Sequence, residues 1–398
     1  MNVRHPGVLM VTGAYYPEMS GAGLQCRALV TRLRSDVDFS VLTTTSDRTL
    51  PRRDIQDGVP VWRVFVDPTS WRSKALAALG FVRAFAVTSQ RFSIVHLHGF
   101  SQKSVVVALL ALVYRKRLAI KLTSFGDDDP VSISKRGWLP AWCLRKSDVF
   151  FAVSPRFRES YDRLGLPSGR FRVIPNGVDL LRFRPPVDDE RGALRNRLRI
   201  PAGDPVVLFV GFFSREKRPD LLFDAWADMV AARGCQATLV FVGATRSSYH
   251  EVDAQLATDI RAEAERRGLA GQVHFVESTR TIEEFHRAAD IFVLPSLREG
   301  MPNALLEAMA SGAACIVTRL EGITDHIIEH GRNGLLFPPG DGAALAEALT
   351  LVARDPAHAR QLGAEARRTV EARFALDQTA REYLETYRAL LGDSPCAA

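Results

Sequence analysis

The stretch Leu294-Pro-Ser-Leu-Arg-Glu-Gly-Met-Pro-Asn-Ala-Leu-Leu-Glu-Ala-Met-Ala-Ser-Gly312 decides the fold, because it joins a strand end, a polar turn and a short helix. Pro302 suits the first turn of a helix, where its missing NH group costs nothing, and a serine and a glycine at the end form a stop. These signals predict a helix over residues 303–310. Glu299 then lies in the loop that precedes the helix.

The predicted helix has two different faces. Asn303 and Glu307 are four residues apart and share one face, whereas two alanines, a leucine and a methionine share another that can pack on a sheet. The NH groups near Gly300, Met301 and Asn303, together with the positive helix end, suit phosphate oxygens or sugar hydroxyls. A carboxylate accepts from pairs of hydroxyls, which suits Glu307 to a ribose and Glu299 to a sugar ring. An amphipathic surface helix with solvated glutamates is the alternative.

Three segments together resemble one known family. The spacing of Glu299 and Glu307 resembles the E-x7-E signature of the family 4 retaining glycosyltransferases (group 1), which have the GT-B architecture. Ile174-Pro-Asn-Gly-Val-Asp179 resembles their interdomain motif, and Phe209-Val-Gly with Lys217 resembles the motif that opens their donor domain. Order and spacing fit over nearly the whole chain. The resemblance implies an α/β fold of two Rossmann-like, doubly wound domains that face a central cleft.

Composition excludes several other classes of protein. The 398 residues are 46% hydrophobic and 24% charged, which suits two soluble globular domains. Five scattered cysteines without C-x-x-C spacing argue for a reducing compartment and against structural zinc. The longest apolar run, residues 105–114, is about half of what spans a bilayer, and no cleavable signal pattern opens the chain. We therefore expect a cytoplasmic protein, either free or at the inner face of the membrane, with no nucleic-acid partner.

The alternation of predicted strands and helices suggests the domain boundaries. Residues 1–185 are expected to form an N-terminal acceptor-binding domain, and residues 186–375 a C-terminal donor domain that binds the nucleotide sugar. The resemblance implies that the helix in residues 376–398 crosses back to the first domain. Helices are predicted at 71–88 and 376–391, and strands at 39–43, 61–66, 93–98, 118–123, 149–153, 206–211, 238–242, 273–276, 291–294 and 314–317.

Polar residues of the first domain follow its predicted strands. Gly21 lies in a glycine loop between a strand and a helix, where the backbone can approach a diphosphate. His98 ends a strand at the edge where α/β sheets bind ligands, although a structural histidine is an equal alternative. The resemblance implies a histidine near the donor sugar and the acceptor where this chain has Phe125. The contact that this histidine makes is therefore absent here. We therefore expect the acceptor side to use His98, Ser124, Asp127 and Asp128.

A pair of cations opens the second domain. The resemblance implies an arginine and a lysine that hold the donor diphosphate; Lys217 matches the lysine, but Phe212 occupies the arginine position. A departing diphosphate needs positive charge as its bond breaks, so we expect Arg215 to supply the missing cation. A solvated surface Arg-x-Lys pair is the alternative. The expected catalytic residues are Glu299, Lys217 and Arg215.

Positive charge gathers in the first half of the chain. Residues 66–175 carry 18 lysines and arginines against 7 aspartates and glutamates, an excess of 18 − 7 = 11, whereas the whole chain carries +7. This asymmetry indicates an anionic partner, either a phosphate-bearing acceptor or a membrane surface.

Two segments of this basic half mix aromatic residues with cations, as membrane-surface helices do. In residues 71–88, one side is expected to hold Trp71, Phe81, Val82 and Phe85. Residues 135–146 place two tryptophans among four cations. Ordinary helices packed on the domain are the alternative. The expected lipid contacts are Arg72, Lys74, Lys135 and Arg136.

Together the patterns predict a retaining glycosyltransferase that moves a sugar from a nucleotide sugar to a hydroxyl of a glycan or lipid-linked acceptor. The resemblance implies that the enzyme needs no cofactor and no metal, even at the Asp-x-Asp of Asp127 and Asp129, because cations of the protein replace the metal. It also implies that the departing phosphate accepts the acceptor's proton. A nucleotide-sugar epimerase of similar shape and a non-catalytic nucleotide-sugar binding protein remain as alternatives.

Overall fold

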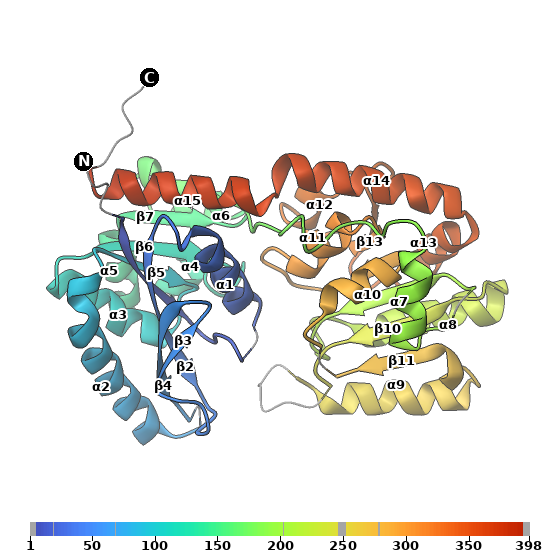
Figure 1. The fold of residues 1–398 in the computed structure, drawn as a ribbon, viewed down its shortest axis with the longest axis horizontal. Coiled ribbons are helices and arrows are strands. Elements are labelled where there is room, and N and C mark those ends of the chain that lie inside the picture. The colour runs from blue at the N-terminus through green and yellow to red at the C-terminus, as the bar shows by residue number, and fades with distance from the viewer. Residues whose placement is uncertain are drawn as a thin grey trace. The chain divides into compact units, whose positions relative to one another are not determined.

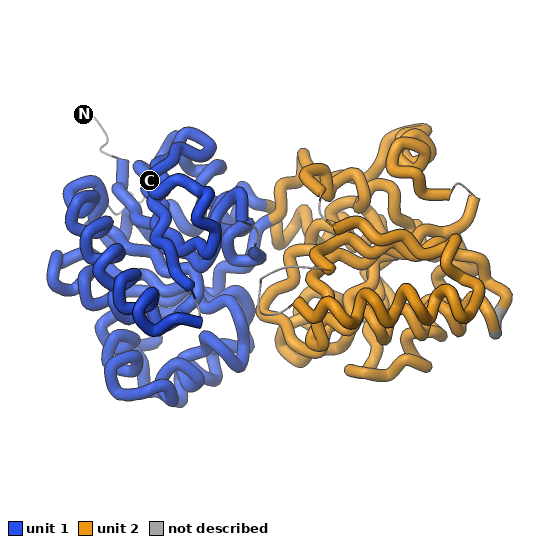
Figure 2. Tube along the Cα trace, turned by 90° about the horizontal axis from the view of Figure 1, so that it is seen from below, with its two compact units in different colours: residues 1–177, 376–398 blue, residues 178–375 orange. Residues whose placement is uncertain are grey.

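The computed structural model describes residues 5–18, 20–67, 69–201, 203–245, 252–277 and 279–392, and the chain divides into two compact units. Unit 1 comprises residues 1–177 and 376–398, and unit 2 comprises residues 178–375 (Figure 2). The sequence analysis placed the first boundary at residue 185. Each unit is built on a largely parallel sheet with helices packed on it, so the predicted α/β class is confirmed (Figure 1).

The sheet of unit 1 has the strand order β3-β4-β2-β1-β5-β6-β7-β8. Neighbouring strands are parallel except for β3 and β4, which are antiparallel. The order reverses between β1 and β5, so the carboxyl ends of these two strands mark the switch point where open α/β sheets bind ligands. The strands are β1 Gly7–Thr12, β2 Asp38–Thr45, β3 Arg53–Gln56, β4 Val59–Phe65, β5 Ile94–His98, β6 Arg117–Leu122, β7 Val149–Ala152 and β8 Phe171–Val173.

The last helix of the chain completes the core of unit 1. Tyr383 and Tyr387 of α15 are fully buried in a cluster with residues of β1 and β5. Tyr387 Oη lies 2.6 Å from Nδ1 of His96, which is itself buried on β5. The helices of unit 1 are α1 Gly21–Leu33, α2 Trp71–Thr88, α3 Gln102–Val113, α4 Pro130–Ser134, α5 Trp138–Lys146, α6 Phe157–Arg163 and α15 Leu376–Leu390.

Helix α2 has the predicted bounds, but its expected aromatic face is wrong. Phe81 and Phe85 are buried against the domain, whereas Trp71 is 74% exposed and Val82 is exposed as well. The buried positions centre about a quarter turn away from Trp71 and Val82, so these four side chains straddle the edge of the packed face.

Unit 2 has a six-stranded sheet in the order β11-β10-β9-β12-β13-β14, with all neighbours parallel. In chain order this is the 3-2-1-4-5-6 arrangement of nucleotide-binding domains, and it reverses between β9 and β12. Apart from the edge strand β11, whose last three residues are half-buried, the strands are short, mostly apolar and almost wholly buried, as parallel strands covered on both faces are. The strands are β9 Val206–Val210, β10 Thr238–Val242, β11 Val273–Val276, β12 Ile291–Leu294, β13 Ala314–Thr318 and β14 Leu335–Phe337.

Helix α11 forms over the predicted residues 303–310, with Pro302 at its N-cap. Leu305, Ala308 and Met309 are buried as expected, whereas Ala304 is only half-buried. No helix within the described ranges combines the length and apolar character that crossing a bilayer requires. The helices of unit 2 are α7 Glu190–Leu198, α8 Pro219–Arg233, α9 Ala254–Arg266, α10 Ile282–Ala288, α11 Asn303–Ala310, α12 Thr324–Ile327, α13 Gly342–Arg354 and α14 Pro356–Arg373.

Candidate active site

Two predicted catalytic residues meet at the switch point of unit 2. Lys217 lies in the loop after β9 and Glu299 in the loop after β12. Lys217 Nζ donates to Glu299 Oε1 at 2.6 Å, and the Leu297 NH group donates to the Glu216 carbonyl at 2.7 Å, which ties the two loops together. The Glu299 side chain is 8% exposed and that of Lys217 26%. The result is a partly desolvated ion pair where a nucleotide-binding sheet takes its ligand.

The remaining predicted donor residues follow Glu299 without a break. Gly300 and Met301 are buried, and Asn303 and Glu307 are half-buried on α11. Four residues of separation place Asn303 and Glu307 one turn apart on the same face. The positive end of the α11 dipole therefore lies beside the loop that carries the ion pair.

His286, which the sequence analysis did not predict, contacts Glu307. Nε2 of His286, on α10, lies 3.4 Å from Glu307 Oε2. The ring is fully buried beside Phe183 and Phe292, and neither nitrogen has a hydrogen-bond partner within the described residues. His286 belongs to no motif, because its contact forms only when α10 packs beside α11.

Arg215 does not join the ion pair. Its side chain is 86% exposed, and its Nε lies 3.2 Å from Oδ2 of Asp253. The family's arginine position, Phe212, is half-buried. Of the three expected catalytic residues, the structure brings together Lys217 and Glu299 and leaves Arg215 at the surface.

The two histidines of β5 in unit 1 have different surroundings. His96 contacts Tyr387 through Nδ1, as described above, and acts as a structural residue. His98, whose ring centroid is 4.5 Å from that of His96, is also buried, but neither of its nitrogens has a partner within the described residues. Burial lowers the pKa of both imidazoles well below their usual value, so both are neutral. His98 therefore keeps free hydrogen-bonding capacity at the unit 1 switch point.

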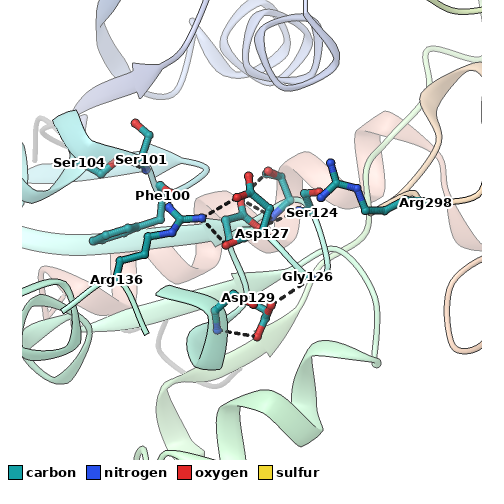
Figure 3. Close-up of polar contacts among 12 residues, drawn as sticks. Phe100, Ser101, Ser104, Ser124, Gly126, Asp127, Asp129, Arg136 and Arg298 are labelled. Atoms are coloured by element: carbon teal, nitrogen blue, oxygen red, sulfur yellow. Dashed lines mark hydrogen bonds and ion pairs between the residues drawn. The ribbon is translucent and has the colours of Figure 1, made fainter. Parts of the chain in front are cut away.

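The loop after β6 holds the predicted Ser124, Asp127 and Asp128, and the two aspartates serve different purposes. Asp128 is buried and accepts from the Thr123 hydroxyl at 2.6 Å and from the Ser124 NH group at 2.7 Å. Burial raises the pKa of Asp128 to about 6. Asp127 is exposed, and its carboxylate pairs with Arg136 at 2.6 Å (Figure 3).

The Asp-x-Asp of this loop separates into two unrelated contacts. Asp129 caps α4 by accepting from the Ser132 NH group at 3.2 Å and from the Gly126 NH group at 3.0 Å (Figure 3). Arg136, besides pairing with Asp127, donates to the Phe100 carbonyl at 2.8 Å. This cation, expected at a lipid surface, is thus engaged in holding the loop.

Phe125, which occupies the family's histidine position, packs within unit 1. Its ring lies edge-on to Phe157 with centroids 5.7 Å apart, and the Arg156 guanidinium lies 4.6 Å above it. The side chain therefore offers an apolar surface where the family supplies an imidazole.

A further cation, which the sequence analysis did not predict, lies at the end of β1, beside the glycine loop. Lys103 Nζ, from α3, donates to the Thr12 carbonyl and to the Thr44 hydroxyl, each at 3.0 Å, and burial lowers the pKa of this lysine to about 8. Gly21, the predicted diphosphate contact, is the first residue of α1. At Gly23 an added Cβ atom would lie 2.3 Å from the Ala14 carbonyl oxygen, so only glycine allows helix and loop to approach this closely.

Comparison with known proteins identifies the family. The family described as "Glycosyl transferases group 1" matches residues 190–369, and "Glycosyl transferase 4-like domain" matches residues 20–177. The lipopolysaccharide core biosynthesis mannosyltransferase LpcC of Rhizobium leguminosarum bv. viciae is 31% identical over 64% of this chain and 68% of that one. The chain is a group 1 glycosyltransferase. The predicted family and the glycosyltransferase enzyme class are thereby confirmed.

Other proteins resemble this glycosyltransferase over nearly its whole length. Alpha-maltose-1-phosphate synthase of Mycolicibacterium smegmatis is 26% identical over 96% of this chain and 98% of that one. The structure of sucrose-phosphate synthase from Thermosynechococcus elongatus matches 98% of this chain and 100% of that one, with a TM-score of 0.81 and 23% identity. That of Anabaena HepE with UDP-glucose matches 97% and 100%, with a TM-score of 0.76 and 20% identity. These likenesses confirm the predicted GT-B fold.

Proposed function

We propose that this glycosyltransferase moves a sugar from a nucleotide sugar to a hydroxyl group of its acceptor with retention of configuration, and that it needs neither metal nor cofactor. The observation that carries the proposal is the Lys217–Glu299 ion pair at the switch point of unit 2. The place matches where sheets of this strand order bind nucleotides. The solved HepE complex with UDP-glucose, a protein of the same fold, supports a nucleotide-sugar donor.

Each donor-side residue then has a chemical role. Lys217 neutralises the diphosphate as its bond to the sugar breaks, and Glu299 accepts hydrogen bonds from hydroxyls of the transferred sugar. Glu307 accepts from the ribose hydroxyls, held in place by His286. Gly300, Met301 and Asn303 present backbone and the helix end to the phosphates.

Arg215 supplies a second cation in this proposal. Its present contact with Asp253 is a surface pair, and such pairs contribute about 0–1 kcal/mol. Leaving Asp253 for a bound diphosphate therefore costs little, and two protein cations take the place that a metal holds in other transferases.

Retention follows from attack on the same face of the sugar that the diphosphate leaves. The acceptor oxygen bonds to the anomeric carbon, the bond to the phosphate oxygen breaks, and that oxygen receives the acceptor's proton. No protein base is required. The apolar Phe125 at the family's histidine position is compatible with such a step.

The acceptor in this proposal is a glycan or lipid-linked molecule bound by unit 1. His98 offers ring nitrogens that have no partner among the residues the structure describes, and Asp127 offers an exposed carboxylate, while Asp128 fixes the loop that carries Ser124. LpcC, named for lipopolysaccharide core biosynthesis, supports an acceptor of this kind.

Product analysis after a donor screen tests the function. Nucleotide sugars are first ranked by thermal shift, since a ligand at about 100 times its dissociation constant adds roughly 2.7 kcal/mol to stability. The best donor is then incubated with the full chain, without acceptor and in EDTA. Slow release of free sugar that is first formed with the donor's anomeric configuration, read by NMR, is the expected result. An isomerised donor would indicate an epimerase, no turnover a binding protein, and the opposite anomer inversion.

A further inference from the structure

A pocket of about 260 Å³ opens in unit 1, away from the residues singled out above. Its lining residues come from the carboxyl ends of β2 and β4 and from the loop that leads from β2 to β3. Figure 1 labels these strands. Three arginines, Arg48, Arg52 and Arg63, line it together with one acidic residue, Asp47, and with Thr45, Leu50 and Phe65. We name it the arginine pocket.

Arg63 lines the pocket with a guanidinium group that is buried and incompletely paired. Its side chain is 1% exposed, and its ion pair from Nη1 to Asp54 Oδ2 is long at 3.3 Å. Nη1 also donates to the Pro51 carbonyl at 3.4 Å. Nη2 donates to the Tyr16 carbonyl at 2.7 Å, whereas Nε has no partner within the described residues. A buried guanidinium normally has its donors satisfied, so the spare NH group indicates a missing acceptor.

The other two arginines are at the mouth of the arginine pocket. Arg48 and Arg52 are exposed, and the Arg48 guanidinium lies 4.5 Å above the Phe65 ring. Stacking of this kind holds the planar group over the pocket wall while its NH groups remain available.

Acidic groups offset only part of this charge, because two ionised carboxylates, those of Asp47 and Asp54, stand against three guanidinium groups. Asp47 accepts from the Thr49 NH group at 2.8 Å and from the Thr49 hydroxyl at 2.7 Å, so its carboxylate is engaged in its own turn. Glu18 lies beside Thr45, and burial raises the pKa of its carboxyl. Asp54 is shared between Arg63 and Gln56.

We propose that the arginine pocket binds a phosphate group of the acceptor. Guanidinium groups match phosphate oxygens in pairs, and three of them around one pocket suit a doubly charged phosphomonoester better than a neutral sugar. The bond from Arg63 to Tyr16 joins the pocket to the loop between β1 and α1, at the ligand-binding edge of the sheet. This inference rests on the proposed function, because it names the acceptor of that reaction.

Binding to the full-length chain tests the pocket with no knowledge of the true acceptor. Glucose 6-phosphate and glucose are titrated by calorimetry into the wild type and into the Arg48→Ala/Arg52→Ala double variant, whose exposed side chains leave the core intact. Glucose 6-phosphate should bind the wild type and bind the double variant about tenfold or more weakly, because two charge-assisted contacts are lost. Arg53→Ala is the matched control, since Arg53 stacks on Trp62, 3.7 Å away, and does not line the pocket.

Vesicles distinguish a soluble phosphate from a lipid phosphate. Co-sedimentation is compared on phosphatidic acid and on phosphatidylserine at equal surface charge. Loss of the preference for phosphatidic acid in the double variant supports a lipid phosphomonoester, whereas loss of glucose 6-phosphate binding alone supports a soluble acceptor. If glucose 6-phosphate and phosphatidic acid each bind the double variant as strongly as they bind the wild type, the proposal is overturned. UDP binding, measured in parallel, reports on the donor side, so failure of the proposed function is seen separately.

Discussion

Each unit has a largely parallel sheet with a switch point, but different kinds of residue lie at the two switch points. In unit 2 the strand ends carry an ion pair, Lys217 with Glu299, in loops that reach solvent. In unit 1 the corresponding edge carries His98, Asp128 and Lys103, groups whose pKa values burial displaces toward the uncharged form. The same architecture thus presents fixed charge in one unit and desolvated polar groups in the other.

This difference indicates a division of labour between the units. A leaving diphosphate changes its charge during the reaction, and fixed cations stabilise that change. An acceptor hydroxyl is neutral until it attacks, so a neutral hydrogen-bonding group such as the His98 imidazole at the unit 1 edge suits it. Four experiments test this contrast, beginning with the largest expected effect.

Loss of Lys217 should be the most damaging single change. Lys217→Ala removes a cation that acts where charge develops, so kcat should fall by about 10² to 10³ while the dissociation constant of UDP rises less. If Arg215 shares the role, Arg215→Ala should approach this loss, and the double variant should cost less than the two effects added. Near wild-type turnover for Arg215→Ala, with Lys217→Ala crippled, would leave Arg215 as a surface residue. Asp253→Asn, which removes the charge that pairs with Arg215 but keeps a capping side chain at the start of α9, serves as the control.

Burial of Asp128 should make the free energy of unfolding depend on pH. Asp128 has a pKa of about 6 when folded, above its ordinary value of 3.8, so the folded state binds more protons between these values. Its contribution to the free energy of unfolding is therefore largest below pH 4 and is lost as pH rises through 6, by about 3 kcal/mol. Urea unfolding from pH 4.5 to 7.5 should show the wild type losing stability relative to Asp128→Asn. Parallel curves would contradict the desolvated aspartate.

A substitution of Glu307 tests the proposed hydrogen bonds between its carboxylate and the donor ribose. Glu307→Gln keeps the shape but replaces one acceptor oxygen with a donor group, so UDP binding should weaken by about 1 to 3 kcal/mol. The His286→Gln variant should have a smaller effect in the same direction, because it acts through Glu307. Calorimetry decides, with Glu347→Gln, an exposed glutamate of α13, as the control. Unchanged affinity in a folded Glu307→Gln variant would remove the ribose assignment.

Membrane association should show the smallest effect. Trp71 and Trp138 are 74% and 78% exposed, near Arg72, Lys74 and Lys135 in the sequence. Attraction of about 1 kcal/mol per cation supports weak binding of unit 1 to anionic vesicles, and Arg72→Gln with Lys74→Gln should reduce it. Vesicles of phosphatidylcholine are the control in co-sedimentation. Binding that ignores anionic lipid content, or is absent at low salt, would exclude the association.

The strands and helices predicted best are those whose sequence pattern has a local cause. Buried parallel strands are continuous apolar runs, so 238–242, 273–276 and 291–294 were predicted at their observed bounds. Strand β3 was missed because it is a polar edge strand, and β14 because three apolar residues are too short a signal.

The residues of the candidate site also fall into those with a local sequence signal and those without one. Glu299 and Lys217 could be predicted because motifs carry them, and their meeting follows from strand order. His286, Lys103 and Arg63 could not, because each acts through a contact between elements distant in the sequence. On α2, the helical period predicts which residues share a face, but it does not predict which face packs against the rest of unit 1.

The burial of α15 in unit 1 has a consequence for how the chain is made. Residues 178–375 hold all the strands of the unit 2 sheet and can fold as they leave the ribosome. Residues 1–177 emerge earlier, yet Tyr383 and Tyr387 fill their core and arrive last. The first unit to be synthesised is therefore the second to be finished, and until Tyr383 and Tyr387 emerge it exposes His96 and the apolar surface around β1 and β5 to other molecules.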